Sequence, residues 1–246
     1  MIIATDAIVL RQIPYSESSI ICRLFTKKEG KITIIAKGAR RSKKYISGLL
    51  EPINYISILY YNKNNRDIQL LKDIASINNF KNIRKNLNSI IIAFAIVEIL
   101  DKTILNNHPY PIIFRLTWRV LDKLNNVSEN HWEIFAFYLY HLSLRLGFMP
   151  NLTICSKCES EMNRAGINTL SGDLVCINCL SSNEDSYFNL DIIIKLKLIH
   201  IDEVTTLALD KKEILNLVIF FETFLTFHIE GIKNMKSMKM VKKLLY

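Results

Sequence analysis

The sequence of 246 residues lacks the short motifs that mark the commonest nucleotide-binding and hydrolytic sites. It contains no GxxxxGK(S/T) phosphate loop and no GxGxxG fingerprint, which excludes the two usual glycine-rich cradles for nucleotides. It also contains no HExxH zinc-protease motif and no GxSxG nucleophile turn. Because nothing in the chain calls for catalysis, we expect a protein that is not an enzyme.

Long apolar runs are missing as well. The most apolar run, Ile90 to Leu100, is shorter than the ~20 residues that a membrane-spanning helix needs, and it contains Glu98. The start, MIIATDAIVLRQI, has no basic stretch before its apolar residues and no small-residue cleavage site, as a secretory signal would have. We therefore expect a cytoplasmic protein that contacts no membrane.

Cysteine is used sparingly, and four of the five cysteines form two CxxC pairs. Each pair can present two thiolates to one ion, and four sulfurs at about 2.3 Å complete a tetrahedral zinc site with no open position. In a cytoplasmic protein, paired cysteines favour metal binding over disulfides. Cys22 stands apart in a predicted strand and is interpreted as a packed core thiol. The spacing predicts one structural zinc ion held by Cys155, Cys158, Cys176 and Cys179.

A catalytic zinc site is the alternative for this cluster. His131-x-Glu133 precedes the first cysteine pair, which loosely resembles the zinc-deaminase signature of H-x-E followed by P-C-x-x-C. However, Pro150 is not adjacent to Cys155, and the second cysteine pair saturates the ion without His131. We therefore interpret His131 as a residue in the first turn of a helix.

Positive charge is concentrated in the first third of the chain. Residues 1–80 hold 13 Lys and Arg against 6 Asp and Glu, a net +7, out of a formal +9 for the whole chain. After Glu230 the tail holds five lysines and no carboxylate. A basic N-terminal domain indicates a polyanionic partner, with a solvated surface as the alternative interpretation.

The first 80 residues show the pattern of short strands. Runs rich in Ile, Val and Leu are separated by short polar breaks, with hairpin-like spacing. Five such strands predict a small barrel or sandwich. The predicted strands are Ile2–Gln12, Ser18–Thr26, Lys31–Lys37, Ile53–Tyr61 and Arg66–Ser76.

The segment from Lys37 to Tyr45, between the third and fourth predicted strands, has five basic residues and no acidic residue. It is too short and too polar to belong to a core. We predict an exposed loop that is well placed for phosphate contacts.

From about Asn79 the apolar spacing becomes helical. Ser128 is the predicted N-cap of the third helix, and Gly147 and Pro150 end that helix. The predicted helices are Leu87–Leu105, Tyr110–Leu124, Trp132–Leu146, Leu190–Leu198, Lys211–Ile229 and Ser237–Leu244.

Several short motifs occur in an order and at a spacing that together are specific. They are Asp6-Ala-Ile-Val-Leu-Arg11, Pro14-Tyr-Ser-Glu-Ser18, Glu29-Gly-Lys31, Lys37-Gly-Ala-Arg-Arg41, Leu146-Gly-Phe-Met-Pro150 and His228-Ile-Glu-Gly-Ile-Lys233 with Lys236-Ser237. With them the chain resembles the RecO family of bacterial recombination mediators over nearly its whole length. It departs from many relatives at Glu159, where they have Gly after the second cysteine, and at Ser171-Gly172, where a Gly pair is common.

The resemblance implies an α+β protein. An N-terminal OB-fold β-barrel is expected at residues 1–80 and a mainly α-helical domain at residues 81–246. A four-cysteine zinc finger is expected as an insertion in the helical domain, at about residues 151–182. The departures at Glu159 and Ser171-Gly172 bear on the turn geometry of this finger and not on its metal.

The resemblance also implies a function without nucleotide hydrolysis. RecO-like proteins bind single- and double-stranded DNA, anneal complementary strands and engage single-strand-binding protein. With RecR they help to load RecA onto coated DNA, which would place this chain in the cytoplasm with the nucleoid. The alternative is a general OB-fold protein that binds single-stranded DNA or RNA and carries a structural zinc finger.

An OB-fold binds single strands across its second and third strands and the adjoining loops, where cations meet phosphates and aromatic rings stack on bases. The resemblance implies a partner, single-strand-binding protein, whose C-terminal tail is acidic and has an aromatic tip. We expect Lys233, Lys236 and Lys239, near the end of this chain, to flank a groove that receives that tail. The predicted DNA contacts are Arg11, Tyr15, Lys27, Lys28, Lys31, Lys37, Arg40, Arg41, Lys43, Lys44 and Tyr45.

Overall fold

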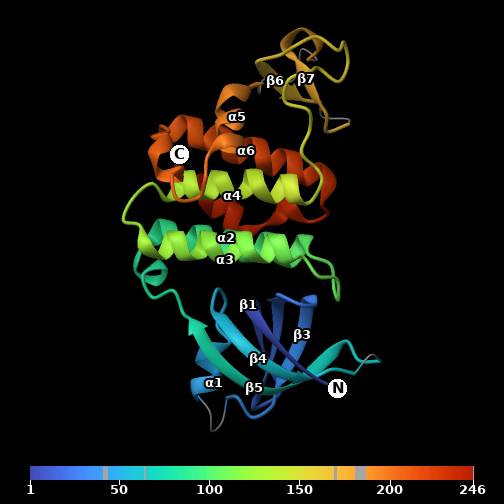
Figure 1. Ribbon diagram of the computed structural model, residues 1–246, viewed down its shortest axis with the longest axis vertical. Coiled ribbons are helices and arrows are strands. Elements are labelled where there is room, and N and C mark those ends of the chain that lie inside the picture. Colours follow the sequence, from blue (N-terminus) through green and yellow to red (C-terminus); the bar gives the residue numbers. More distant parts are fainter. Residues whose placement is uncertain (41–43, 64, 169–170, 181–186, 246) are drawn as a thin grey trace. The chain divides into compact units, whose positions relative to one another are not determined.

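The computed structural model describes residues 1–40, 44–63, 65–168, 171–180 and 187–245, with the backbone alone for Lys44, Tyr187 and Lys233. The chain forms two compact units, Met1–Asn126 and Val127–Tyr246. Two long helices therefore group with the strands of the first unit (Figure 1). The division into domains at residues 1–80 and 81–246 stays a prediction.

Five strands of the first unit close into a barrel in the order β1-β2-β3-β5-β4. Neighbouring strands run antiparallel, except that β3 and β5 are parallel. This closed five-stranded barrel is the OB-fold that the resemblance implied. The strands are β1 (Ile2–Tyr15), β2 (Ser19–Thr26), β3 (Gly30–Ala36), β4 (Tyr55–Tyr61) and β5 (Ile68–Asn78).

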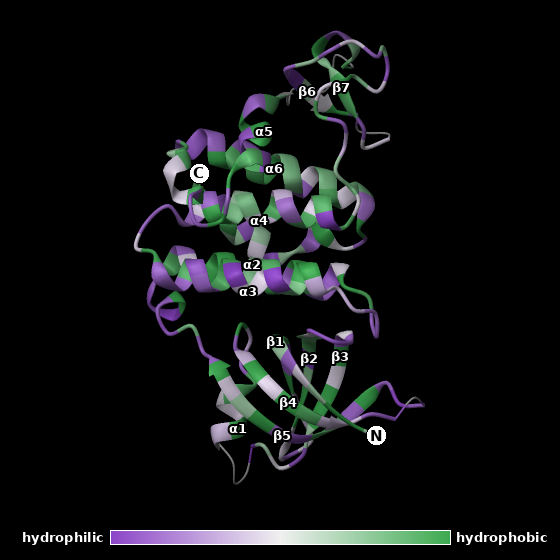
Figure 2. Ribbon diagram, in the orientation of Figure 1, coloured by the Kyte–Doolittle hydropathy of each residue, from purple (hydrophilic) through white to green (hydrophobic). Residues whose placement is uncertain are grey.

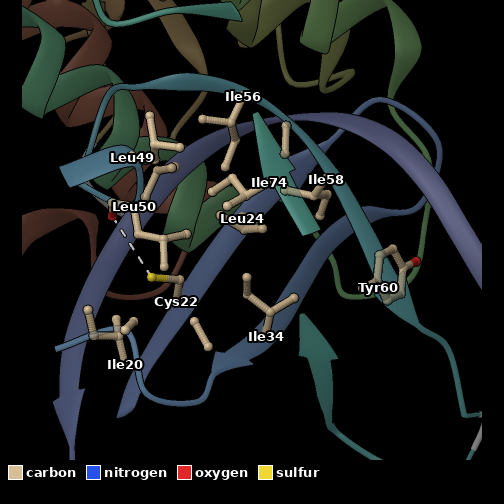
Figure 3. Packing of buried hydrophobic residues seen from close by; sticks show 14 of the residues in the cluster. Ile20, Cys22, Leu24, Ile34, Leu49, Leu50, Ile56, Ile58, Tyr60 and Ile74 are labelled. Atoms are coloured by element: carbon tan, nitrogen blue, oxygen red, sulfur yellow. Dashed lines mark hydrogen bonds between the residues drawn. The ribbon is translucent and has the colours of Figure 1, made fainter. Parts of the chain in front are cut away.

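Alternate residues of each strand fill the barrel, as the side-chain period of two requires. Cys22 lies among them and is fully buried, with Ile20 and Leu24 as inward neighbours on β2 (Figure 3). Its Sγ lies 3.9 Å from the carbonyl oxygen of Leu50. Because the Cys22 side chain is fully buried in this cluster, the interpretation as a core thiol is confirmed. The same burial raises the pKa of the Cys22 thiol to about 12.

Helix α1 (Lys44–Leu49) lies between β3 and β4 in the sequence and was not predicted. Leu49 and Leu50 are buried in the barrel core, and the Gln12 side-chain amide donates to the carbonyl of Ser47 at 3.1 Å. These tertiary contacts stabilise a helix that is too short to form from local propensity alone. The basic segment predicted as an exposed loop therefore ends in a helix.

Helices α2 (Leu87–Thr103) and α3 (Pro111–Asn126) belong to the same unit and follow a short 3-10 turn, η1 (Ile83–Lys85). The ring of Phe114 meets that of Phe25 edge to face at 5.3 Å. Trp118 stacks on Tyr55, with centroids 6.3 Å apart. Aromatic contacts thus hold α3 against the outer surface of the barrel.

The connection between α2 and α3 passes very close to the start of β3. The backbone N–H of Asn107 donates to the carbonyl of Lys31 at 3.1 Å, and the Lys31 N–H donates to Leu105 at 3.3 Å. Gly30 has a φ of +69°, and a Cβ at this position would fall 1.8 Å from the carbonyl oxygen of His108. Only glycine fits at this approach of two backbones.

The second unit contains α4 (His131–Arg145), α5 (Leu190–Leu198), α6 (Lys211–His228) and α7 (Lys236–Leu245), with 3-10 turns η3 (Val204–Leu207) and η4 (Ile232–Asn234). Helix α6 begins with a capping box between Asp210 and Glu213. The prediction of Ser128 as the N-cap of α4 is wrong. Asn130 stands there instead, at a φ of 56° and without a side-chain cap, because its amide donates to the carbonyl of Thr205.

A small sheet in the order β7-β6-β8 lies between α4 and α5 in the sequence. Its strands are β6 (Arg164–Ile167), β7 (Leu174–Cys176) and β8 (Tyr187–Asn189), with η2 (Ile177–Cys179) after β7. Strands of three or four residues are too short to show a readable period, so they were not predicted. Among the described residues, no helix is both long enough and apolar enough to span a membrane.

Candidate metal centre and nucleic-acid surface

The four paired cysteines meet at one point of the second unit, and their sulfur atoms all lie within 4.8 Å of one another. The first pair comes from the turn before β6, and the second pair from the end of β7 and η2. The Ser156 hydroxyl donates to the carbonyl of Leu174 at 2.8 Å and ties the first turn to β7. The sequence prediction of the cluster is confirmed.

Each pair sits on a turn of the same hydrogen-bonding pattern. The N–H of Glu159 donates to the carbonyl of Cys155 at 3.0 Å, and the N–H of Leu180 donates to that of Cys176 at 3.1 Å. The Sγ atom of Cys155 also accepts hydrogen bonds from the backbone N–H groups of Lys157 at 3.4 Å and Cys176 at 3.2 Å. Such N–H donors stabilise the thiolate form of a cysteine.

The cluster cannot hold four thiolates without a cation. Desolvation by burial opposes ionisation of Cys155, but the backbone N–H groups of Cys176, Cys158 and Lys157 lower its pKa to about 6. For Cys179, the hydrogen bond with Cys158 is the largest of several effects that raise its pKa to about 12. Because neighbouring thiolates repel one another, a complete set of four needs a bound positive ion.

The sulfur spacing fits zinc. Four sulfurs bonded at about 2.3 Å to a tetrahedral ion lie about 3.8 Å from one another. The Sγ atoms of Cys158 and Cys176 are 3.7 Å apart. Four soft sulfur ligands in this arrangement leave no position for water, which is the pattern of a structural site.

His131 does not belong to this donor set, which among the described residues consists of the four cysteines. It is the first residue of α4, as predicted, and is buried. Desolvation lowers its pKa, although a hydrogen bond with the backbone of Val127 opposes the shift. Burial raises the pKa of Glu133. The deaminase-like arrangement is therefore not formed.

Glu159 has a φ of +59°, in the left-handed region that favours glycine. This is the position at which the resemblance led us to expect Gly. The equivalent residue of the second turn, Leu180, has a φ of −69°. The departure noted in the sequence therefore falls on a residue whose backbone is strained.

The predicted DNA contacts of the first unit fall at two opposite ends of the barrel and on its outer face between them. Antiparallel β1, β2 and β3 place the turn at residues 16–18 and the segment after Ala36 at one end. The turn at residues 27–29 lies at the other end. Hydrophilic residues gather in the loops at these ends (Figure 2).

One end gathers Tyr15, Lys37, Arg40 and Tyr45. The Arg40 guanidinium donates to the carbonyl of Ser16 at 3.1 Å, and its backbone N–H donates to that of Ser18 at 2.9 Å. Tyr15 is 52% exposed and Tyr45 is 66% exposed. Helix α1 lies at this end, away from α2 and α3 (Figure 1). Arg41, Lys43 and the side chain of Lys44 lie outside the described residues.

The other end holds Lys27, Lys28 and Lys31. Lys27 and Lys28 are exposed in the turn, and the Lys28 ammonium donates to the carbonyl of Ala4 at 2.7 Å. The Lys31 ammonium donates to the carbonyl of Asp101 in α2 at 2.6 Å. Desolvation lowers the pKa of Lys31, and the charge of Asp101 opposes that shift. Lys31 is therefore engaged within the unit.

Arg11 lies on the outer face between the two ends, exposed and paired in register with Arg23. A bulge between Val9 and Arg11 shifts the register, so that Arg11 faces outward whereas Val9 points into the core. Tyr61, Lys63 and Arg66 were not among the predicted contacts, and they are exposed at the end of β4 and in the loop before β5. Their strand-end position was the only signal.

The described part of the predicted partner site lies on α7. Lys236 and Lys239 are exposed there, and Met240 beside them is 53% exposed. Ser237, Met238, Val241 and Leu245 form the buried face of the helix. Lys242 forms an ion pair with Glu222 of α6, with Nζ 2.6 Å from Oε2. The side chain of Lys233 lies outside the described residues.

The chain combines an OB-fold barrel, a fold that commonly binds oligonucleotides or oligosaccharides, with a helical unit whose four-cysteine cluster suits a structural metal ion. Two family models match the chain: "Recombination protein O N terminal" over residues 1–80 and "Recombination protein O C terminal" over residues 84–238. The chain belongs to the recombination protein O family, RecO.

Curated relatives agree with this assignment. The chain is 34% identical to "DNA repair protein RecO" of Salinibacter ruber, covering 70% of this chain and 62% of the relative. It is 32% identical to the protein of that name from Pelodictyon phaeoclathratiforme, over 66% of this chain and 62% of the relative. It is 30% identical to the protein of that name from Syntrophus aciditrophicus, over 72% of this chain and 70% of the relative. The aligned part spans about three fifths of the length of the first two relatives.

Proposed function

We propose that this chain is a DNA repair and recombination mediator that binds single- and double-stranded DNA and anneals complementary strands. With RecR it would help to load RecA onto DNA that single-strand-binding protein covers. The observation that carries the proposal is the pair of family matches, which together cover residues 1–80 and 84–238.

The end of the barrel that carries helix α1, together with the outer face of the barrel, supports a DNA-binding role. Arg11, Lys37 and Arg40 are exposed there, with two exposed tyrosines among them. Cations that neutralise phosphates and rings that stack on bases are the two elements of single-strand recognition. The proposed DNA surface does not include Lys31, because its ammonium is bound to α2.

The second unit would supply a scaffold and a docking site. We propose that the four thiolates hold one zinc ion, which shapes the finger and takes part in no chemistry. The basic face of α7, with Lys236, Lys239 and the exposed Met240, would receive the acidic tail of single-strand-binding protein. A positive rim around an apolar residue suits an acidic peptide with an aromatic tip.

Annealing is the activity to test first. Two complementary oligonucleotides with a fluorophore and a quencher would be mixed with and without the purified protein. We expect faster pairing with the protein, and an affinity for each strand that falls as salt rises. A chain that neither binds nor anneals DNA at low salt would rule the proposal out.

The same assay distinguishes the recombination mediator from the alternative, a general OB-fold protein that binds single-stranded DNA or RNA. An RNA strand of the same sequence would compete with the labelled DNA. We expect DNA to be bound at least as tightly as RNA. A clear preference for RNA, with no acceleration of pairing, would favour the general OB-fold binder instead.

A further inference from the structure

The outer face of the barrel carries an unbroken apolar row that follows the register from strand to strand. Each member pairs directly with the next, through β1, β2, β3, β5, β4 and the start of β1. Directly paired residues share one face of a sheet. In order, the row is Ile13, Ile21, Ile35, Leu70, Tyr61 and Ile2.

These side chains point away from the barrel core. The residue next to five of the six belongs to the core cluster or packs against it, as Ile34, Leu71 and Tyr60 do. Ile13 faces outward because it pairs directly with Ile21, whose neighbours on β2 are in the core. Tyr61 is 39% exposed and Ile2 is 46% exposed, whereas the other four are partly exposed. The outer face of a barrel in water is usually polar, so a continuous apolar row calls for an occupant.

The row begins and ends on the same strand, because the strands of a closed barrel are staggered. Ile2 and Ile13 both lie on β1, so the row winds around the barrel and does not close on itself. Five steps between strands of about 4.8 Å each give it a length of about 24 Å. That length suits a strand of several nucleotides, within the ~4–16 that one OB-fold covers.

Cations border the row along its length. Arg11 is two residues from Ile13 on one side, and Lys37 is two residues from Ile35 on the other. At the β4 end, Lys63 and Arg66 are exposed in the loop that follows Tyr61.

Gln69 holds that loop in place. Its amide donates to the carbonyls of Lys63 at 3.1 Å and Arg66 at 2.7 Å, and its oxygen accepts the Lys63 N–H at 2.9 Å. The loop carries one carboxylate, Asp67, against two cations, so its net charge is positive.

We propose that this row is the path of single-stranded DNA on the barrel, and that Tyr61 is a base-stacking residue at its far end. The proposal rests on the proposed DNA-binding function and extends its contact surface past β3 onto β5 and β4. A single strand offers flat apolar base faces together with a phosphate at every nucleotide, and this combination matches an apolar row bordered by cations. A duplex keeps its base faces stacked inside and cannot use the row.

The test measures the affinity of the full chain for oligothymidylate of about 15 nucleotides and for a duplex of equal length. Tyr61→Ser should weaken oligothymidylate binding about tenfold, as the loss of one stacked base does, and leave duplex binding within about twofold. Tyr61→Phe keeps the ring and should bind like the wild type. Ile2→Ser, at the exposed end of the row, should also weaken single-strand binding.

Ile77→Ser is the matched control, because Ile77 is 47% exposed on β5 but lies outside the row. It should bind both DNAs like the wild type, and thermal melts should show all variants folded. Unchanged oligothymidylate affinity in both Tyr61→Ser and Ile2→Ser would overturn the path, as would equal losses for single strand and duplex. A wild-type chain that binds neither DNA would instead reject the proposed function itself.

Discussion

The guanidinium of Arg23 lies 2.8 Å from the carboxylate of Asp101, which joins strand β2 to helix α2. Lys31 of β3 reaches the same residue, with its ammonium on the Asp101 carbonyl. The end of α2 thus holds two basic side chains of the barrel. This relationship separates the cations of the OB-fold into those that support the unit and those that are free to meet phosphates.

The first prediction compares Lys31, the second residue of β3, with Lys37, which directly follows that strand. Lys37→Met should reduce the slope of log affinity against log salt by about 0.7 for single-stranded DNA, because one phosphate contact is lost. Lys31→Met should leave that slope unchanged and lower the free energy of unfolding by about 1 kcal/mol, since it removes a hydrogen bond to α2. Fluorescence anisotropy over a salt series and urea unfolding measure the two effects. A shallower slope in Lys31→Met alone would reverse the assignment.

The second prediction concerns the metal. Cys158→Ser should lower the zinc content, measured by mass spectrometry of the purified protein, well below one ion per chain, because three sulfurs bind more weakly than four. The second unit should then unfold more readily, whereas DNA binding by the barrel should survive at low temperature.

Cys22→Ala is the matched control for the zinc measurement, because this thiol lies in the barrel core. It should retain the full zinc content while losing stability. If Cys158→Ser kept its zinc, the four-sulfur site would be wrong. If it folded normally and lost DNA binding alone, the separation of scaffold and DNA surface would be wrong.

The third prediction follows from the left-handed backbone of Glu159. Glu159→Gly should raise the free energy of unfolding of the finger by about 1 kcal/mol, because glycine adopts a positive φ without steric cost. Leu180→Gly changes the equivalent residue of the second turn, where φ is −69°, and should lose stability. Thermal melts of the zinc-bound protein distinguish the two. Equal effects at both sites would show that backbone strain is not the cause.

The fourth prediction tests the basic face of α7. Lys236→Glu with Lys239→Glu should abolish binding of an acidic peptide with a C-terminal aromatic residue, measured by calorimetry, because both changes reverse charge on one face. Lys211→Glu with Lys212→Glu makes the same change in charge at the exposed start of α6 and should bind the peptide normally. Equal losses in both variants would indicate a general effect of net charge and not a docking site.

The features that sequence predicted well are those with a local or covalent signature. The spacing of Cys155, Cys158, Cys176 and Cys179 predicted the cluster, because two CxxC pairs place four donors in one small region. Apolar runs predicted the barrel strands and the long helices. Cys22 was correctly placed in the core from its position in a predicted strand.

The features that the sequence did not reveal depend on contacts between distant residues. The start of α4 is set by the hydrogen bond of Asn130 to Thr205, and α1 forms because Leu49 and Leu50 reach the barrel core. The outer apolar row is invisible in the sequence, because it exists only through the register of five strands. For the same reason Tyr61 carried no signal beyond its position at the end of a predicted strand.

Photo-crosslinking tests the central claim, that single-stranded DNA runs along the outer face of the barrel. An oligothymidylate with 5-iodouracil at single positions would be irradiated with the protein, and the crosslinked peptides would be identified by mass spectrometry. We predict crosslinks in residues 1–80, at Tyr15, Tyr45 or Tyr61. Crosslinks confined to residues 127–245 would contradict the account.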